Sequence, residues 1–141
     1  MLDLNSKFGR VIKKHLKNEY FVWLTTVDSK GTPQPRPVWF VWDDNSFLVF
    51  SQPNAYKVKH LQNNPKVSLH FNTIDDAGEK HVIIFTGEAS FDEKIPPAHK
   101  LPAYLKKYKT EITGLKMTPE GFRNEYSRAI RIKPTEVRGW E

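Results

Sequence analysis

The sequence predicts an α+β fold that is mainly β: a small antiparallel barrel of six strands with flanking helices, in one domain over residues 1–141. Short runs of β-branched and aromatic residues recur along the chain, and turn-forming Gly, Pro, Asp or Asn residues bound each run. A length of 141 residues is typical of one domain, and a content of 38 % hydrophobic and 13 % aromatic residues is typical of a globular protein.

The first part of the chain predicts one helix and three strands. Residues 3–18 repeat apolar side chains at helical spacing, with Asp3 as the expected N-cap. A strand follows over residues 20–27 and ends at an Asp-Ser-Lys-Gly turn. The second strand runs from there to about residue 42, and the third covers residues 46–51 after an Asp-Asp-Asn turn. Short turns of this kind join antiparallel neighbours.

The second part predicts one further helix and three further strands. Residues 55–62 have helical composition, open after Pro-Asn and stop at Asn-Asn-Pro. Strands are expected over residues 66–73 and 81–91, and Gly87 interrupts the latter at a bulge or bend. Residues 126–140 form the last strand. The polar segment between the last two strands, residues 92–125, predicts a helix near 98–108 and another that opens at residue 118.

The segment "GTPQPRPVWF", residues 31–40, places a proline at every second position: Pro33, Pro35 and Pro37. Because proline has no backbone N–H, a full hydrogen-bond ladder cannot form on that side of the strand. The backbone from Arg36 to Trp39 can then lie against a flat ligand, and the planar guanidinium of Arg36 suits a phosphate or a ring carbonyl. The alternative is an edge strand that prolines and charge protect from aggregation.

The apolar run Val38-Trp39-Phe40-Val41-Trp42 follows the prolines without a polar residue. Such a run predicts burial on both faces, by the core on one and by a second subunit on the other. An edge strand alone does not account for it. The run therefore favours a ligand groove.

Lys57 lies in the first turn of the helix predicted over residues 55–62. Free backbone N–H groups and the positive end of the helix dipole favour an anion there. The hydroxyl of Ser51, at the preceding strand end, and the Lys57 ammonium can add hydrogen bonds to it. The alternative is a lysine in solvent on an exposed helix face.

The net charge of +6, from 22 Lys+Arg against 16 Asp+Glu, suits an anionic partner or serves solubility alone. No basic block of five residues and no zinc-finger, helix-turn-helix or RNP pattern is present, which disfavours nucleic acid. No apolar run approaches the ~18 residues of a membrane span, and no signal-peptide pattern opens the chain. With no cysteine, we expect a cytoplasmic protein without disulfides. The five histidines show no metal-ligand spacing, and no G-x-S-x-G motif is present.

Two motifs carry a resemblance to a known family. They are G-x-P-x-x-x-P-V-W-F at residues 31–40 and S-x-x-x-x-x-K-x-x-x-L-x-x-N-P at residues 51–65. With "IIFTGEASF" and a terminal "RGW", the chain resembles the pyridoxamine 5′-phosphate oxidase-like split-barrel superfamily from about residue 20 to residue 140. The segment "PRPVWFVWDD" is similar to the corresponding segment in the small deazaflavin-using branch of that superfamily.

The resemblance implies a homodimer of six-stranded split barrels, with two flavin-type cofactors in grooves at the interface. The cofactor is FMN or the deazaflavin coenzyme F-420, and the sequence does not decide between them. Matching positions of the family bind the cofactor phosphate at Ser51 and Lys57, and set the ring against the Arg36 to Trp39 stretch, which includes Pro37 and Val38. The last strand of similar proteins reaches the groove, sometimes from the partner chain, and this implies roles for Arg138 and Trp140.

The function that the resemblance implies is hydride transfer between a bound flavin or deazaflavin and an unidentified small organic molecule. The cofactor supplies the reactive atom, so catalytic side chains stay unassigned. A binding protein for flavin, deazaflavin or haem without turnover and a nucleic-acid-binding or regulatory barrel are the alternatives. The additional arginines and the longer C-terminal region of the true oxidases are missing, which disfavours pyridoxamine phosphate as substrate. Residues 92–125 are expected to be a scaffold, with a lid or a basic site for a polyglutamate tail as alternatives.

Overall fold

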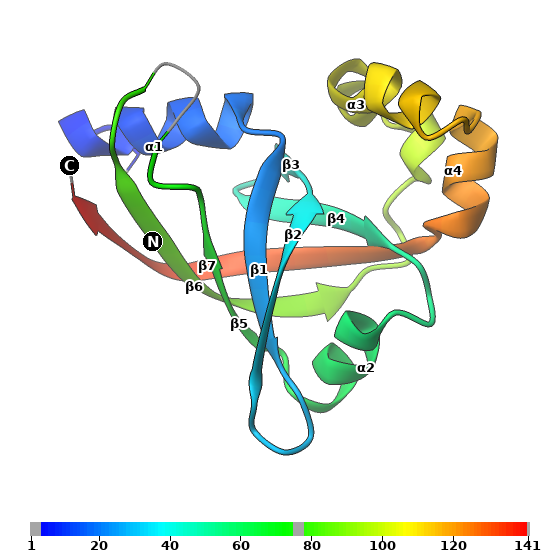
Figure 1. The fold of residues 1–141 in the computed structure, drawn as a ribbon, viewed down its shortest axis with the longest axis horizontal. Coiled ribbons are helices and arrows are strands. Elements are labelled where there is room, and N and C mark those ends of the chain that lie inside the picture. The colour runs from blue at the N-terminus through cyan, green and yellow to red at the C-terminus, as the bar shows by residue number, and fades with distance from the viewer. Residues whose placement is uncertain (1–3, 75–77, 141) are drawn as a thin grey trace.

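One antiparallel sheet of seven strands, curled into a half-barrel, forms the centre of the molecule (Figure 1). The structure is a computed structural model, and it describes residues 4–74 and 78–140. The elements in chain order are α1 (Lys7–Asn18), β1 (Phe21–Val27), β2 (Pro33–Trp39), β3 (Val41–Asp43), β4 (Ser46–Ser51), α2 (Tyr56–Asn63), β5 (Lys66–His70), β6 (Val82–Phe91), the 3-10 helix η1 (Ala98–Lys100), α3 (Pro102–Gly114), α4 (Pro119–Glu125) and β7 (Arg128–Trp140). The strand order β2-β1-β5-β6-β7-β4-β3 puts two consecutive strands, β2 and β3, at the two edges. The predicted antiparallel barrel with flanking helices is confirmed.

The strand count differs from the prediction because the strand expected to run from after the first turn to about residue 42 divides at Phe40 into β2 and β3. The backbone groups of Phe40 bond to α3. The Tyr108 hydroxyl accepts from Phe40 N–H (2.8 Å), and Lys107 Nζ donates to Phe40 O (2.9 Å). Side chains some 70 residues later therefore end one strand and start the next.

The proline-rich strand β2 is a sheet edge. It pairs with β1 along its whole length, from Pro33 opposite Val27 to Trp39 opposite Phe21. Within the described ranges no strand lies on its other side. Because proline has no backbone N–H, a strand with alternating prolines is tolerated at a sheet edge. The prediction that no strand pairs with its second side is confirmed for the described residues.

Helix boundaries differ from the predictions at two places. Helix α1 begins at Lys7, because the Ser6 hydroxyl accepts from Gly9 N–H (2.9 Å) as the N-cap; the expected cap, Asp3, lies outside the described residues. The helix expected near 98–108 is a short 3-10 turn followed by α3, which Pro102 opens at its first turn. No helix in the described ranges is long and apolar enough to cross a membrane.

The predicted bulge at Gly87 is confirmed. The register of β6 against β7 shifts between Thr86 and Gly87. A Cβ on Gly87 would lie 2.8 Å from the carbonyl oxygen of Lys133, so only glycine allows the strands to approach this closely.

The apolar residues form two clusters, one on each face of the β2–β4 region. Inside the half-barrel lie Val22, Leu24, Phe40, Phe47, Leu69 and Phe85 among others. On the outer face, Val41 and Phe50 pack with Tyr104, Tyr108 and Phe122 of α3 and α4. The second face of the apolar run is therefore covered by helices of the same chain, where the sequence predicted a second subunit. Residues 92–125 supply that cover.

Candidate functional site

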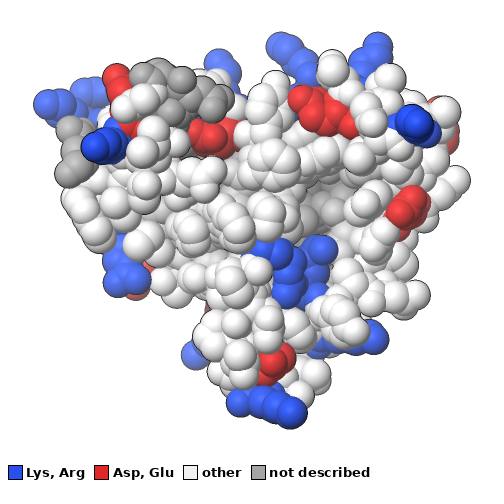
Figure 2. All heavy atoms as spheres, viewed as in Figure 1, with Lys and Arg blue, Asp and Glu red and all other residues white. Residues whose placement is uncertain are grey.

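The first half of the candidate site is a groove of about 650 Å³ between β2 and the start of α2. We call it the cationic groove; its lining residues are Arg36, Gln52, Pro53, Asn54, Ala55, Tyr56, Lys57 and Glu125. Figure 2 shows Lys and Arg side chains gathered on this face between the β1–β2 hairpin and α2, beside a hollow toward α3 and α4. Two cations from separate elements thus meet at one concave surface.

The second half is a smaller space of about 200 Å³ that continues from the first. We call it the aromatic pocket; its lining residues are Phe21, Pro37, Val38, Trp39, Phe50, Lys57, Tyr104, Leu115, Phe122 and Tyr126. Lys57 lines both halves, so the two spaces adjoin at its side chain. The site therefore has a charged end and an apolar end.

Arg36 and Lys57 are both half-buried, and neither has an acidic partner. Burial lowers the pKa of Arg36, and burial followed by the charge of Arg36 lowers the pKa of Lys57. Of the carboxylates in the described residues, none lies within 4.0 Å of either cation, the distance that defines an ion pair. Glu125, at the rim, instead accepts a hydrogen bond from the Gln52 side chain (2.8 Å). The two charges repel each other, and a bound anion would relieve this repulsion.

Arg36 is oriented by a short polar chain behind the groove. Its Nη1 donates to the Thr26 hydroxyl (3.5 Å), and Thr26 Oγ1 lies 2.8 Å from Nδ1 of His60 on α2. Thr26 is fully buried, so its hydroxyl occupies one fixed place. Strand β1, strand β2 and helix α2 are tied together at the cationic end.

The start of α2 adds backbone donors to the same end. Its N-cap is Ala55, whose side chain cannot accept a hydrogen bond from the first-turn N–H groups. The first helical residues, Tyr56 and Lys57, line the groove, so the positive end of the helix dipole lies at the groove wall. Lys57 lies in the first helical turn, as the sequence predicted.

A ladder of stacked rings forms the wall of the aromatic pocket. Trp39 stacks on Tyr108 with ring centroids 4.8 Å apart and on Phe122 at 5.6 Å, and Phe122 stacks on Tyr126 at 4.5 Å. Burial raises the pKa of Tyr104, which lines the same wall and stays a neutral phenol. This role of residues 92–125 was not predicted from the sequence. The spacing of Tyr104 and Tyr108, four residues apart on one helix face, was the signal available.

The structure brings together five of the predicted site residues: Arg36, Pro37, Val38, Trp39 and Lys57. Ser51 is adjacent in sequence but is fully buried, and its hydroxyl donates to the carbonyl of Gln52 (2.9 Å). It lines neither half of the site. The ligand-binding role of each of these residues stays a prediction.

The remaining two predicted residues, Arg138 and Trp140, lie elsewhere in the chain. They are near the end of β7, opposite Ile84 and Val82 of β6. In Figure 1 this end lies beside α1, across the sheet from α2. The Trp140 side chain is 58 % exposed. Within one chain these two residues do not reach the groove.

No metal centre accompanies the site in the described part of the chain. No group of three or more His, Cys, Asp or Glu side chains there could hold an ion. The lining residues of the two halves include no histidine.

Comparisons with known proteins agree with this architecture. A profile described as pyridoxamine 5′-phosphate oxidase matches residues 8–141. Pyridoxine/pyridoxamine 5′-phosphate oxidase 2 of Hydrogenovibrio crunogenus is 33% identical over 69 residues, which cover 48% of this chain and 32% of that protein. The match thus spans about a third of the length of this curated relative.

Two solved structures are similar in fold. A conserved hypothetical protein from Mycobacterium tuberculosis matches with a TM-score of 0.73 and 19% identity, covering 96% of this chain and 84% of that one. An F420 reductase matches with a TM-score of 0.65 and 23% identity, covering 89% and 94%. These likenesses show the fold, and the profile match over residues 8–141 shows the family: the chain belongs to the pyridoxamine 5′-phosphate oxidase family.

Proposed function

We propose that the protein is a flavin- or deazaflavin-dependent oxidoreductase that transfers a hydride between its bound cofactor and a small organic molecule. One observation carries the proposal: two half-buried cations, Arg36 and Lys57, face one groove without an acidic partner among the described residues. Their charge, together with the first-turn N–H groups of α2, suits the phosphate of such a cofactor.

The adjoining aromatic pocket suits the ring system of the same cofactor. The outer edge of β2 carries no strand partner in the described chain, so the backbone from Pro37 to Trp39 can lie against a planar ligand. Lys57 stands between the two halves, where the phosphate-bearing chain would meet the ring. A flavin or deazaflavin, when bound, accepts or donates a hydride at its central ring.

The side chains of the site bind and orient, and none is placed to act as a strong acid or base at the apolar end. The lining residues there are aromatic and aliphatic, apart from Lys57. Tyr104 and Tyr126 are the other lining residues with a transferable proton, and burial raises the pKa of Tyr104, which keeps its proton in place. These walls exclude water from the ring, which protects a reduced cofactor from side reactions.

A homodimer with the cofactor at its interface is part of the proposal. Large apolar side chains at the rim of the site stay exposed in the single chain, namely Phe21 (50 %), Leu115 (50 %) and Tyr56 (75 %). A second copy of the chain would cover them and could supply Arg138 and Trp140 to the groove. Sedimentation at several protein concentrations tests this directly, and a strictly monomeric protein would contradict it.

The relatives support both cofactors, FMN through the oxidase family and coenzyme F-420 through the similar F420 reductase. Fluorescence titration of the purified protein with each cofactor decides between them. Oxidation of the reduced, bound cofactor by a quinone or an enone then tests turnover. Saturable binding followed by substrate-dependent oxidation supports the proposal; absence of binding by both cofactors contradicts it.

A cofactor carrier without turnover is the second candidate. It is favoured by the aromatic pocket, where no lining residue is a carboxylate or an imidazole. Tight cofactor binding without any acceptor-dependent oxidation would establish it. Haem is less favoured in this groove, because the lining residues include no histidine, cysteine or methionine and offer only tyrosine among the usual axial ligands of haem iron.

A further inference from the structure

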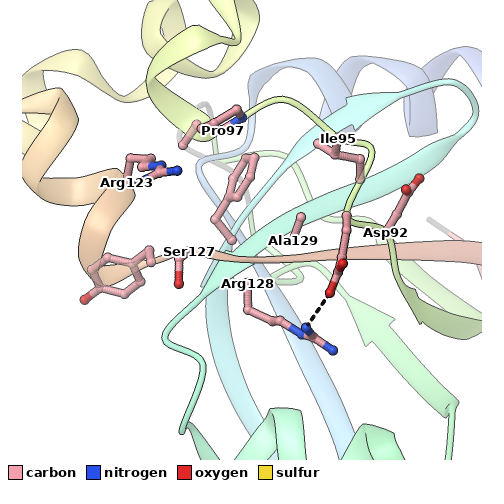
Figure 3. A pocket seen from close by; sticks show the side chains of 11 residues that line it. Asp92, Ile95, Pro97, Arg123, Ser127, Arg128 and Ala129 are labelled. Atoms are coloured by element: carbon pink, nitrogen blue, oxygen red, sulfur yellow. Dashed lines mark hydrogen bonds and ion pairs between the residues drawn. The ribbon is translucent and has the colours of Figure 1, made fainter.

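A second cavity, of about 270 Å³, adjoins the aromatic pocket. We call it the arginine cavity; its lining residues are Phe50, Asp92, Glu93, Ile95, Pro97, Ala98, Arg123, Tyr126, Ser127, Arg128 and Ala129. Figure 3 shows side chains from β4, the segment after β6, α4 and the start of β7 around it. Phe50 and Tyr126 line both this cavity and the aromatic pocket, so the two spaces are neighbours on either side of these side chains.

Arg128 lines this cavity and has one guanidinium N–H without a partner among the described residues. Its Cζ lies 4.2 Å from the centre of the Phe91 ring, and its Nη1 donates to Glu93 Oε1 (3.3 Å; Figure 3). Its Nε is buried and has no hydrogen-bond partner in the described part of the chain. Buried N–H groups nearly always have partners, and an orphaned one destabilises the fold until a ligand satisfies it.

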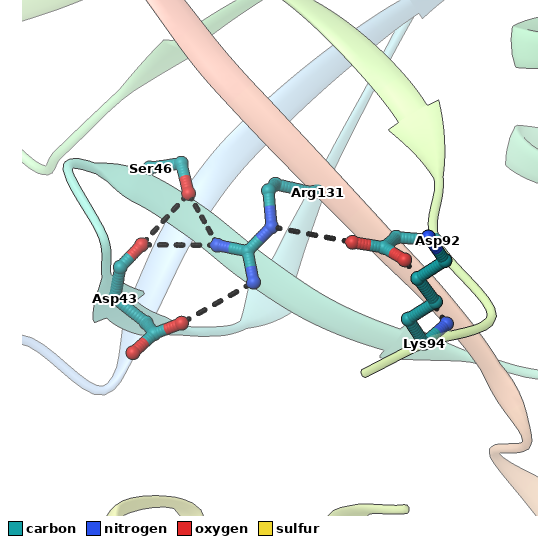
Figure 4. Close-up of polar contacts among 5 residues, drawn as sticks. All are labelled: Asp43, Ser46, Asp92, Lys94 and Arg131. Carbon is teal, nitrogen blue, oxygen red and sulfur yellow. Dashed lines mark hydrogen bonds and ion pairs between the residues drawn. The ribbon is translucent and has the colours of Figure 1, made fainter. Parts of the chain in front are cut away.

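Of the two acids that line the cavity, Glu93 pairs with Arg128, and Asp92 is directed at another arginine. Asp92 lies 3.9 Å from Nε of Arg131, a residue that also holds the Asp43 side chain (3.2 Å; Figure 4). Glu93 is 84 % exposed, so its contact with Arg128 is a solvent-accessible pair of the kind that contributes little.

The second arginine of the cavity, Arg123, has no acidic partner among the described residues. Arg123 of α4 donates to the neighbouring Asn124 amide (3.0 Å), and no carboxylate of the described residues lies within ion-pair distance of it. The remaining walls are apolar apart from Ser127. The cavity thus combines two arginines and two acids with walls that are otherwise mostly apolar, and Arg123 and one N–H of Arg128 are the cationic donors without an acidic partner in the described chain.

We propose that the arginine cavity binds the carboxylate of a small organic acid, held by Arg128 and Arg123 with its apolar body against Phe50 and Tyr126. The fixed planar donors of arginine match a carboxylate in two-point contact. Glu93 already offers a carboxylate to one edge of Arg128, and the ligand would replace it. Asp92 and Glu93 nearby disfavour a doubly charged phosphate. That this acid reacts at the adjoining aromatic pocket rests on the proposed function; its binding does not.

Calorimetric titration with butyrate, and with butyramide as its uncharged analogue, tests the carboxylate site. We expect saturable binding of butyrate and at least about tenfold weaker binding of butyramide, because a charge-assisted hydrogen bond distinguishes them. Equal binding of the two, inorganic phosphate that binds as tightly as butyrate, or no saturable binding of butyrate overturns the proposal.

Variants assign the binding to the cavity. Arg128→Met should weaken butyrate at least about tenfold, and the exposed Arg10→Met on α1 should leave it unchanged. Glu93→Gln removes the competing carboxylate and should tighten butyrate roughly two- to fivefold. Circular dichroism checks that each variant is folded. Unchanged affinity in Arg128→Met, or weaker binding in Glu93→Gln, contradicts the assignment.

The same variants separate this proposal from the proposed function. Lys57→Met should lose cofactor affinity and retain butyrate binding, whereas Arg128→Met should do the reverse. If the wild-type protein binds the cofactor but not butyrate, the carboxylate site alone is overturned. Intact butyrate binding without any cofactor binding overturns the proposed function alone.

Discussion

The arginines of two regions of this sheet have opposite surroundings. Arg131 on β7 donates to the carbonyl of Asp43 (3.1 Å), to the Ser46 hydroxyl (2.6 Å) and to the Asp43 carboxylate (3.2 Å), and Asp92 lies on its other side (Figure 4). Arg36 on β2 has one long hydrogen bond to a hydroxyl and a second cation, Lys57, as its charged neighbour. Both guanidinium groups are partly buried.

We interpret this difference as the one between a structural cation and a ligand-binding cation. A partly buried charge is stable when acids and hydrogen-bond acceptors surround it, as around Arg131. Two half-buried cations side by side destabilise the fold, and arrangements of this kind are common at functional sites. A bound anion would offset the repulsion between Arg36 and Lys57.

The largest expected effect is on ligand binding by the unpaired cations. Lys57→Met should weaken the phosphorylated cofactor about 10- to 150-fold, the equivalent of ~1.5–3 kcal/mol for a hydrogen bond to a charged group. The free energy of unfolding should stay the same or increase, because a repelling charge is removed. Fluorescence titration and urea unfolding measure the two quantities.

Arg131→Met is the matched control. It should lower the free energy of unfolding by about 1–3 kcal/mol, since Asp43 and Ser46 lose their partner, and leave cofactor affinity unchanged. If both variants affected binding and stability alike, the distinction between the two regions would be lost.

The second expected effect contrasts two buried tyrosines one helical turn apart on α3. The Tyr108 hydroxyl contacts Phe40 N–H, Phe40 O and Tyr20 O, whereas the Tyr104 hydroxyl has no partner in the described chain. Tyr108→Phe should cost about 1–3 kcal/mol of unfolding free energy, because it orphans the Phe40 N–H. Tyr104→Phe should be neutral or stabilising. Thermal unfolding measures both, and equal losses would contradict the contrast.

The sequence predicted the elements whose signals are local. The Gly87 bulge, the edge position of β2 and the start of α2 near Lys57 each follow from backbone chemistry within a few residues. Five of the eight residues named for the site, all on β2 or α2, line the two halves, and their ligand-binding role stays a prediction.

The features that the sequence did not predict depend on distant contacts. The break at Phe40 is set by Lys107 and Tyr108. The aromatic wall requires α3 and α4 to fold back onto Trp39. The sequence around residue 40 carries no signal for the strand break or for the aromatic wall. Two tyrosines on one helix face, Tyr104 and Tyr108, are the signal that the sequence does contain.

The smallest expected effect concerns Lys107, whose ammonium donates a hydrogen bond to the Phe40 carbonyl between β2 and β3. Burial, opposed by the charge of Glu19, lowers its pKa from 10.5 to about 8. Between those pH values the unfolded chain binds more protons than the folded one, so this lysine contributes stability that rises with pH. The contribution is complete above pH 10.5 and is lost as pH falls through 8.

Urea unfolding of wild type and Lys107→Met between pH 7 and 9.5 isolates this contribution. The range stops short of 10, the ordinary pKa of the tyrosines, whose ionisation in the unfolded chain acts in the opposite direction. We expect the difference between the two proteins to grow in favour of wild type by roughly 1 kcal/mol or less, since solvent still reaches the ammonium. A difference that is constant with pH would contradict the shifted pKa.

One comparison of affinities tests whether Arg36 and Lys57 bind the phosphate of a planar cofactor. The affinity of wild type and Lys57→Met is measured for FMN and riboflavin, and for coenzyme F-420 and its phosphate-free deazaflavin. The account predicts that wild type prefers the phosphorylated member of one pair at least about tenfold. It also predicts that Lys57→Met loses most of that preference while binding the phosphate-free member as wild type does. Equal affinity for both members of each pair in wild type would contradict it.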